Sequence, residues 1–137
     1  MPEEVKIRWI WLKIMYVYTL VISGGIGLGY ILMPGTMVQM MGLPAQDPIT
    51  FGLAGSIFLA FAVASIFGLR SPLRFAPLLL IELMYKLIWF IGVAAPLVVL
   101  QKFPGYAVPT AIIFATFIIG DLIAIPFPVI FARETGY

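Results

Sequence analysis

Four apolar segments occupy most of the chain, and each is long enough to cross a lipid bilayer as an α-helix. They cover about residues 10–33, 49–69, 75–100 and 108–131. A membrane-spanning helix needs about 20 mostly apolar residues. The pattern predicts an all-α fold, a polytopic transmembrane four-helix bundle, with a single domain over residues 1–137.

Proline and capping residues mark the predicted helix ends. Asp47-Pro48 is predicted to begin the second helix, with Asp47 at the N-cap and Pro48 at the first helical position. Ser71-Pro72 is predicted to begin the third helix in the same way. The segment 36–42, which holds three of the methionines, is predicted to be either a short helix at the outer membrane surface or a flexible loop.

Basic residues are distributed unequally between the two sides of the predicted bundle. Six fall on one side, namely Lys6, Arg8, Lys13, Arg70, Arg74 and Arg133, whereas Lys102 is alone on the other. Lys and Arg concentrate in cytoplasmic loops, so both termini are predicted to be cytoplasmic (N-in/C-in). Aromatic residues near the predicted helix ends are expected at the membrane interface, namely Trp9, Trp11, Tyr16 and Tyr106.

Composition supports a membrane location and excludes several kinds of site. Hydrophobic residues make up 63% and charged residues 10% of the chain, against roughly 45–50% and 25% in soluble domains. Cysteine and histidine are absent, which excludes disulfides, iron–sulfur clusters and His-based catalysis. We therefore predict no cofactor, no metal and no catalytic residue. A net charge of +2 without a basic run argues against nucleic-acid binding.

Small residues predict where helices pack closely. The second segment has small residues at an unbroken four-residue spacing, at Gly52, Ser56, Ala60, Ala64 and Gly68, and the first has Gly25 and Gly29 in a G-x-x-x-G pattern. Membrane helices associate through such faces because small side chains let backbones approach. We predict that these two helices pack together through these positions, with a homodimer interface as the alternative.

Three ionisable residues fall inside predicted spans. Glu82 and Lys86 share one face of the third helix, four residues apart, and Asp121 is in the fourth. At about 1.5 Å per residue, Lys86 and Asp121 are both about 15–16 Å from the cytoplasmic ends of their helices, which predicts that they pair. Pro126 is predicted to disrupt the fourth helix and to free the carbonyl of Leu122.

The charge cluster admits two interpretations. In the structural one, the charges neutralise one another and fix the register of the third and fourth helices. In the functional one, they line a pocket for a polar or cationic headgroup, or relay protons. Tyr85, Trp89 and Phe117 are the candidate lining residues of such a pocket.

Two short segments and one lysine resemble the DoxX-like family of small four-helix membrane proteins. They are Met40-Met41-Gly42-Leu43-Pro44, the proline-containing stretch 68–79 and Lys86. The resemblance implies a four-helix bundle and, in some members, association with membrane redox enzymes; it implies no catalytic residue here. We expect an integral protein of the bacterial inner membrane.

The leading functional interpretation is a small accessory subunit that packs against other membrane protein subunits of a larger complex. The alternative is a small transporter or binder of a lipid, quinone or organic cation that uses Glu82, Lys86 and Asp121. The N-terminus is not expected to be a cleavable signal peptide, because Pro2, Glu3 and Glu4 precede the basic residues.

Overall fold

The structure is a computed structural model that describes residues 6–134. The regular elements of this range are all helical, in the order α1 (Trp9–Tyr18), η1 (Thr19–Ser23), α2 (Gly24–Leu32), α3 (Pro34–Met41), α4 (Pro48–Arg70), α5 (Ala76–Trp89), η2 (Phe90–Ala94), α6 (Ala95–Val99), η3 (Gly105–Ala107), α7 (Val108–Ala124) and α8 (Phe127–Ile130). The predictions about Pro2–Glu4 concern residues outside the described range.

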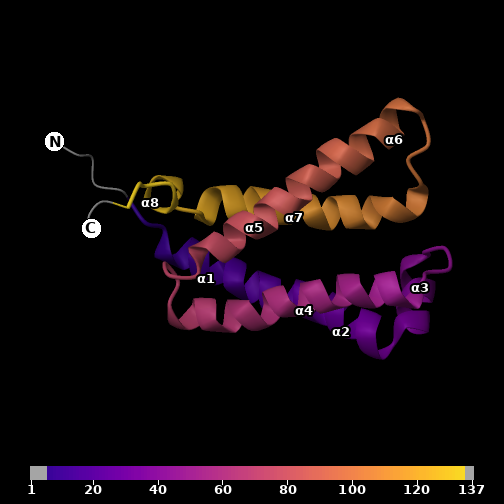
Figure 1. Cartoon of the computed structure of the whole chain (residues 1–137), viewed down its shortest axis with the longest axis horizontal. Coiled ribbons are helices and arrows are strands. Elements are labelled where there is room, and N and C mark those ends of the chain that lie inside the picture. Colours follow the sequence, from indigo (N-terminus) through magenta and orange to yellow (C-terminus); the bar gives the residue numbers. More distant parts are fainter. Residues whose placement is uncertain (1–5, 135–137) are drawn as a thin grey trace.

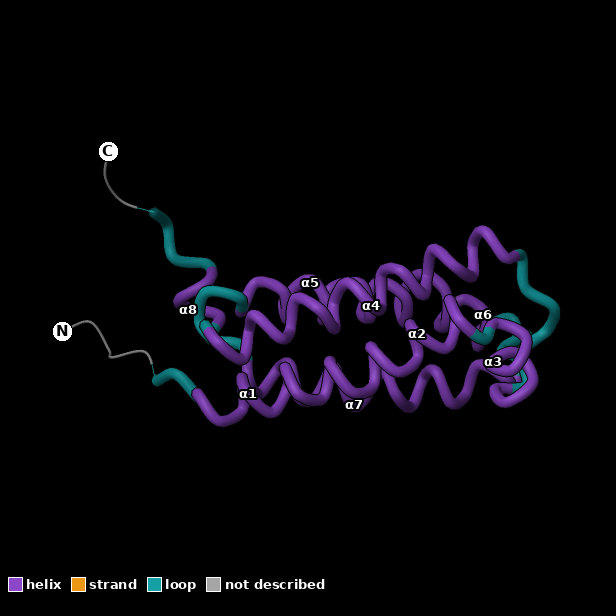
Figure 2. Tube along the Cα trace, turned by 90° about the horizontal axis from the view of Figure 1, so that it is seen from below, coloured by secondary structure: helices purple, strands orange, loops and turns teal. Residues whose placement is uncertain are grey.

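Four helical segments are long and apolar enough to cross a bilayer. They are Trp9–Leu32, Pro48–Arg70, Ala76–Val99 and Gly105–Ala124. The first three agree with the predicted spans to within one residue at each end. The segments form an elongated all-α assembly with α8 and the α4–α5 turn at one end and α3 and η3 at the other (Figure 1, Figure 2).

The helices do not pack evenly along their length. The first segment packs against both α4 and α7, and α5 packs against α7. The third segment diverges from α4 as it continues through η2 and α6 toward the end that carries η3 (Figure 1). The π-helical stretch η2 ends two residues before Pro96. A π-helix is wider than an α-helix, and here it precedes the proline, whose backbone has no N–H to donate.

The prediction of a helix start at Asp47 is confirmed. Its carboxylate accepts hydrogen bonds of 2.9 Å from the backbone N–H of Thr50 and 2.7 Å from the Thr50 hydroxyl. These two bonds lower the pKa of Asp47 below its ordinary value, so the cap is a carboxylate at neutral pH. The prediction for Ser71-Pro72 is wrong, because α5 begins only at Ala76 and its N-cap residue is Phe75.

The fourth helix is shorter than predicted. α7 ends at Ala124, Ile125 is extended, and α8 is a separate short helix that turns away from the axis of α7 (Figure 1). Proline has no N–H and disfavours helical backbone in the residue before it, so Ile125 leaves the helix ahead of Pro126. The predicted span 108–131 is therefore wrong at its C-terminal end.

The methionine-rich segment is a helix, α3. It ends at Gly42, which takes the left-handed conformation (φ 65°). The backbone N–H of the next residue, Leu43, donates a hydrogen bond of 3.0 Å to the carbonyl of Val38. Tyr30 donates a hydrogen bond to the sulfur of Met41 at 3.6 Å, which ties α3 to α2.

The first two membrane-length segments pack together as predicted. Of the predicted positions, Gly68 lies against Tyr16 of α1, whereas the close contacts of α2 with α4 use other residues. A Cβ placed on Gly27 would come within 2.8 Å of the carbonyl oxygen of Gly55, and one on Gly24 within 3.0 Å of Ala62. A Cβ added at Gly25 would meet no packing neighbour within 4 Å among residues 6–134, whereas one added at Gly29 would meet Met37 of α3.

The face of α4 that is buried is also different from the predicted stripe. Its inward residues are spaced by four and three in alternation, at Phe51, Gly55, Phe58, Ala62 and Ser65. A strict four-residue spacing rotates by about 40° per step around a helix of 3.6 residues per turn. The stripe therefore leaves the interface: Ser56 and Ala60 are exposed, Gly52 and Ala64 are half-buried, and Gly68 is buried.

Tyr16 is a core residue and not an interfacial one. It is 0% exposed, its ring packs against Gly68, and its hydroxyl donates a 2.6 Å hydrogen bond to the carbonyl of Pro72. This bond joins α1 to the α4–α5 turn. The other aromatic residues assigned to the interface, Trp9, Trp11 and Tyr106, are exposed.

Candidate functional site

The site is centred on a buried ion pair within α5. Glu82 and Lys86 are each 1% exposed, and the Lys86 Nζ is 3.2 Å from Glu82 Oε1. Residues four apart lie on the same side of an α-helix. Lys86 is ten residues from the start of α5, which places it about 15 Å along a segment long enough to span a hydrocarbon core of about 30 Å.

A hydroxyl group from the first membrane segment completes the environment of Glu82. Thr19 Oγ1 donates to the carboxylate and lies 3.1 Å from each of its oxygens. Thr19 is the first residue of the π-helical stretch η1, and Ser23 is its last. Both hydroxyls face the interior, since Ser23 donates a 2.7 Å bond to the carbonyl of Phe58. Sequence reasoning missed both, although two hydroxyls four apart in an apolar segment were a visible signal.

Lys86 also makes polar and aromatic contacts on its other side. Its Nζ donates to the hydroxyl of Tyr85 at 2.9 Å. The same nitrogen lies 4.1 Å from the ring centroid of Phe117 and 5.4 Å from that of Phe114. Aromatic faces attract a desolvated ammonium group. Lys86 is thus held between a carboxylate and a set of aromatic rings.

Asp121 does not pair with Lys86, contrary to the sequence prediction. Within residues 6–134 the ion pair that forms is the one between Lys86 and Glu82. Neither carboxyl oxygen of Asp121 has a hydrogen-bond partner in this range. The sequence estimate measured the depth of Asp121 from a helix end near residue 131, whereas α7 ends at Ala124, three residues after Asp121. Three residues rise by only about 4–5 Å, so the estimate of about 15 Å from that end does not hold.

Asp121 nevertheless belongs to the same buried region. It is 0% exposed, and its α7 neighbours Phe117 and Ala124 belong to the same buried core as Leu79 and Leu83 of α5. Its neighbour Gly120 is in tight contact with Met15 of α1. The end of α7 is fixed by Arg8, whose Nη1 donates a 3.0 Å hydrogen bond to the carbonyl of Ile123.

A cavity adjoins Lys86 on the side away from Glu82. Its volume is about 40 Å³, and its polar lining consists of Ser23, Tyr30, Tyr85, Lys86 and Thr110. A cavity needs roughly 10–15 Å³ of such volume to hold one water molecule. The space is therefore large enough for a few water molecules or for the polar end of a larger molecule.

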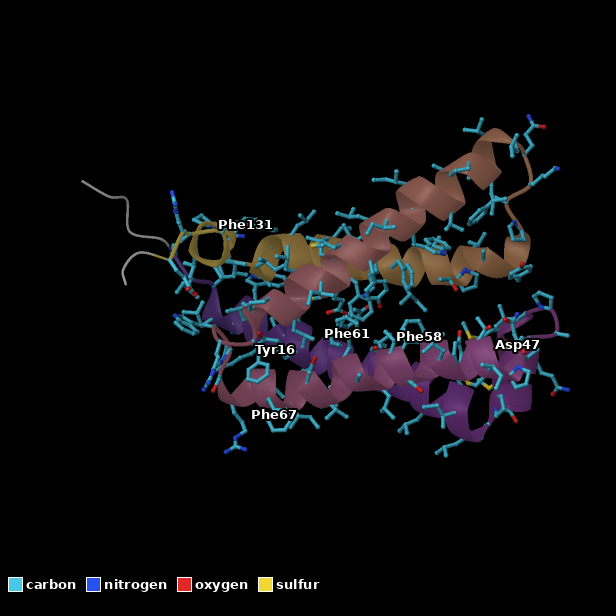
Figure 3. The ribbon with its side chains drawn as sticks, in the orientation of Figure 1. Tyr16, Asp47, Phe58, Phe61, Phe67 and Phe131 are labelled. Atoms are coloured by element: carbon cyan, nitrogen blue, oxygen red, sulfur yellow. The ribbon has the colours of Figure 1, made fainter. Side chains whose placement is uncertain are left out.

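The cavity borders a wide groove between α4 and the diverging third segment. The groove has a volume of about 820 Å³, and it shares with the cavity five lining residues, namely Tyr30, Phe58, Tyr85, Thr110 and Phe114. Figure 3 shows Phe58 and Phe61 on the side of α4 that faces this groove, and Phe67 on the opposite side.

The groove is apolar, and the residues at its margins are suited to contact with lipid. Ile57, Ile81 and Ile88 line it and are also exposed. No acidic or basic side chain is among its lining residues within the described range, and Lys86 is the charged residue that lines the adjoining cavity. Glu82 and Asp121 line neither space, so the groove ends at a cation and not at a carboxylate.

The candidate lining residues are distributed over both spaces. Tyr85 lies at their junction, Phe117 lines the cavity beside Lys86, and Trp89 lines the groove, where its ring is 5.2 Å from that of Phe114. Residues 6–134 hold no group of three or more His, Cys, Asp or Glu side chains placed to bind a metal ion. The arrangement is suited to binding, since it offers hydrogen-bond donors at the end of an apolar groove.

Comparison of the chain with protein-family models, with curated proteins and with solved structures finds no match.

Proposed function

We propose that this protein binds a small amphipathic molecule that enters from the bilayer. The observation that carries the proposal is the groove of about 820 Å³ that opens between lipid-facing isoleucines and leads to the buried Lys86 and Tyr85. Ligand pockets typically have about 300–1,000 Å³, an apolar lining and a few convergent polar groups. The apolar part of the ligand occupies the groove, and its polar end reaches the cavity.

Filling the groove is expected to prevent binding. Ala54 of α4 lines the groove, so Ala54→Trp places a large ring where the ligand would lie. The matched control is Ala60→Trp, on the exposed face of the same helix. Both variants and the parent are purified in mild detergent, and bound small molecules are extracted and measured by mass spectrometry. We expect parent and control to retain the same amphipathic compound and Ala54→Trp to lose most of it.

Equal retention by the two tryptophan variants would contradict the proposal. Binding at the stripe of small residues would give the reverse pattern, with loss in Ala60→Trp only. Thermal unfolding of each variant shows whether it is folded before its ligand content is compared.

A second candidate is the accessory subunit, and one observation favours it. An open surface of small and aliphatic residues runs along the outer face of α4, where Ser56 and Ala60 are exposed and Ala64 is half-buried. Faces of this kind let a further membrane helix approach closely. Membership in a DoxX-like family, with its redox-enzyme partners, fits this second function.

The accessory-subunit function is tested by solubilisation of the protein from native membranes, followed by mass determination. A stoichiometric assembly supports a subunit, and a lone monomer contradicts it.

We further propose that both termini are cytoplasmic. Described basic residues gather at the helix ends near Arg8, Arg70 and Arg133, whereas Lys102 follows α6 at the opposite end (Figure 1). A reporter enzyme inserted at Gln46 is expected on the outer side and one fused after Tyr137 on the cytoplasmic side. Reporters on the same side would contradict the arrangement of four spans, and both reversed would contradict the orientation alone.

A further inference from the structure

We infer that the polar end of the ligand is an uncharged carbonyl oxygen, inserted toward Tyr85 and Lys86 with a flat apolar body in the groove. This inference rests on the proposed function, and it defines the ligand class within it. It selects neutral carbonyl compounds, a class that includes quinones, over fatty acids and over organic cations.

The hydrogen-bond donors at the inner end of the groove carry the first step. The Lys86 ammonium has three N–H groups, of which one bonds to Glu82 and one to the hydroxyl of Tyr85. Because Tyr85 accepts that bond, its own O–H remains available as a donor. Tyr85 lines both the cavity and the groove. A guest therefore meets donors, and its matching group is an acceptor.

The charges around the cavity carry the second step. Lys86 is already paired with Glu82 at 3.2 Å. A carboxylate guest would therefore find no unpaired cation and would have to compete with Glu82 for Lys86. A cationic guest would meet the ammonium of Lys86, since no carboxylate lines the cavity or the groove within the described residues. An unpaired buried charge of either sign is costly, and a neutral acceptor avoids that cost.

The aromatic walls carry the third step. The ring of Tyr85 lies 5.5 Å from that of Phe61 and 5.9 Å from that of Phe114, and Trp89 is 5.2 Å from Phe114. These rings surround the entrance to the cavity from three helices. Aromatic rings pack favourably by stacked and edge-to-face contacts, so a flat body is better suited to this entrance than a branched one.

Three probes that differ only in their polar end test the inference. They are 4-decylacetophenone, with a neutral carbonyl, 4-decylbenzoic acid, with a carboxylate, and 4-decylbenzylamine, with an ammonium group. Each is titrated at pH 7 into purified protein in one detergent, and the rise in the midpoint of thermal unfolding gives the dissociation constant. We expect the ketone to bind at least 10-fold more tightly than either charged probe.

Removing the donor gives the matched comparison. Tyr85→Phe is expected to raise the dissociation constant of the ketone by about 3- to 10-fold, which corresponds to the loss of one net hydrogen bond. The control Tyr18→Phe removes a hydroxyl that bonds to Thr116 Oγ1 at 2.6 Å, lines neither the cavity nor the groove, and is expected to leave the affinity unchanged. The unfolding midpoint without ligand verifies that both variants are folded.

The outcomes separate this inference from the proposed function. Tighter binding of the acid or the amine, abolished by Ala54→Trp, would overturn the carbonyl assignment and support the groove as a binding site. Equal loss of ketone affinity in both tyrosine variants would also overturn it. Failure of all three probes, together with equal ligand retention in Ala54→Trp and Ala60→Trp, would overturn the proposed function itself.

Discussion

Replacement of Lys86 by methionine is expected to lower the free energy of unfolding by about 3–5 kcal/mol, the usual cost of removing one partner from a buried ion pair. Glu82 is 1% exposed, and its carboxylate depends on Lys86 at 3.2 Å and on Thr19 at 3.1 Å. Methionine has a similar length and fills the space among the aromatic rings. The decrease in the free energy of unfolding is therefore due to the missing charge and not to a cavity. Chemical unfolding in mixed micelles, followed by circular dichroism, measures it.

The identity of the partner is tested by a double-mutant cycle. Adding Glu82→Gln to Lys86→Met removes the uncompensated charge and keeps an acceptor for Thr19. We expect it to restore a substantial part of the stability, with a coupling energy of about 0.5–3 kcal/mol, as for residues in direct contact. The parallel cycle with Asp121→Asn is expected to give a smaller coupling, because the carboxyl group of Asp121 makes no hydrogen bond or ion pair within residues 6–134.

Two results would contradict this account. Larger coupling of Lys86 to Asp121 than to Glu82 would restore the pairing predicted from the sequence. Full additivity in both cycles would show that the cluster is not coupled. Lys102→Met, at an exposed lysine in the loop after α6, is the control for removal of a basic residue and is expected to have little effect.

Replacement of Gly27 by alanine is expected to lower the free energy of unfolding by about 1–3 kcal/mol, as overpacking of a well-packed core does. A Cβ on Gly27 would lie 2.8 Å from the carbonyl oxygen of Gly55 and 2.8 Å from the backbone nitrogen of Leu59. Both are main-chain atoms, so no side chain can rotate to make room, and α2 must move away from α4. This cost exceeds the helix-propensity gain of about 0.5–1 kcal/mol that alanine brings over glycine.

Gly25→Ala is the matched control for this prediction. It makes the same chemical change two residues earlier, where the added Cβ would meet no packing neighbour within 4 Å in the described part of the chain. We expect its stability to be unchanged or slightly raised. A loss of stability in Gly25→Ala equal to that in Gly27→Ala would show that the interface follows the G-x-x-x-G pattern after all.

The sequence by itself determined which segments are membrane-length helices and where most of them end. Length and uninterrupted apolarity define such a helix locally, because every backbone hydrogen bond is satisfied inside the segment. The cap at Asp47 is local for the same reason, since the residue that it bonds is three positions away. The sequence also placed Glu82 and Lys86 on one face, because a four-residue separation fixes their relation in any α-helix.

Only the tertiary structure decided which faces of the helices meet. In an apolar helix, the lipid-facing and helix-facing sides have similar compositions, so periodicity could not separate Gly25 from Gly27 or Ala60 from Ala62. The break before Pro126 ended α7 at Ala124, which removed the basis for the predicted pairing of Asp121, and Lys86 pairs with Glu82 instead. The groove was not visible in the sequence either, since it results from the divergence of the third segment from α4 (Figure 1). Helix divergence is a property of packing between segments, and no single segment encodes it.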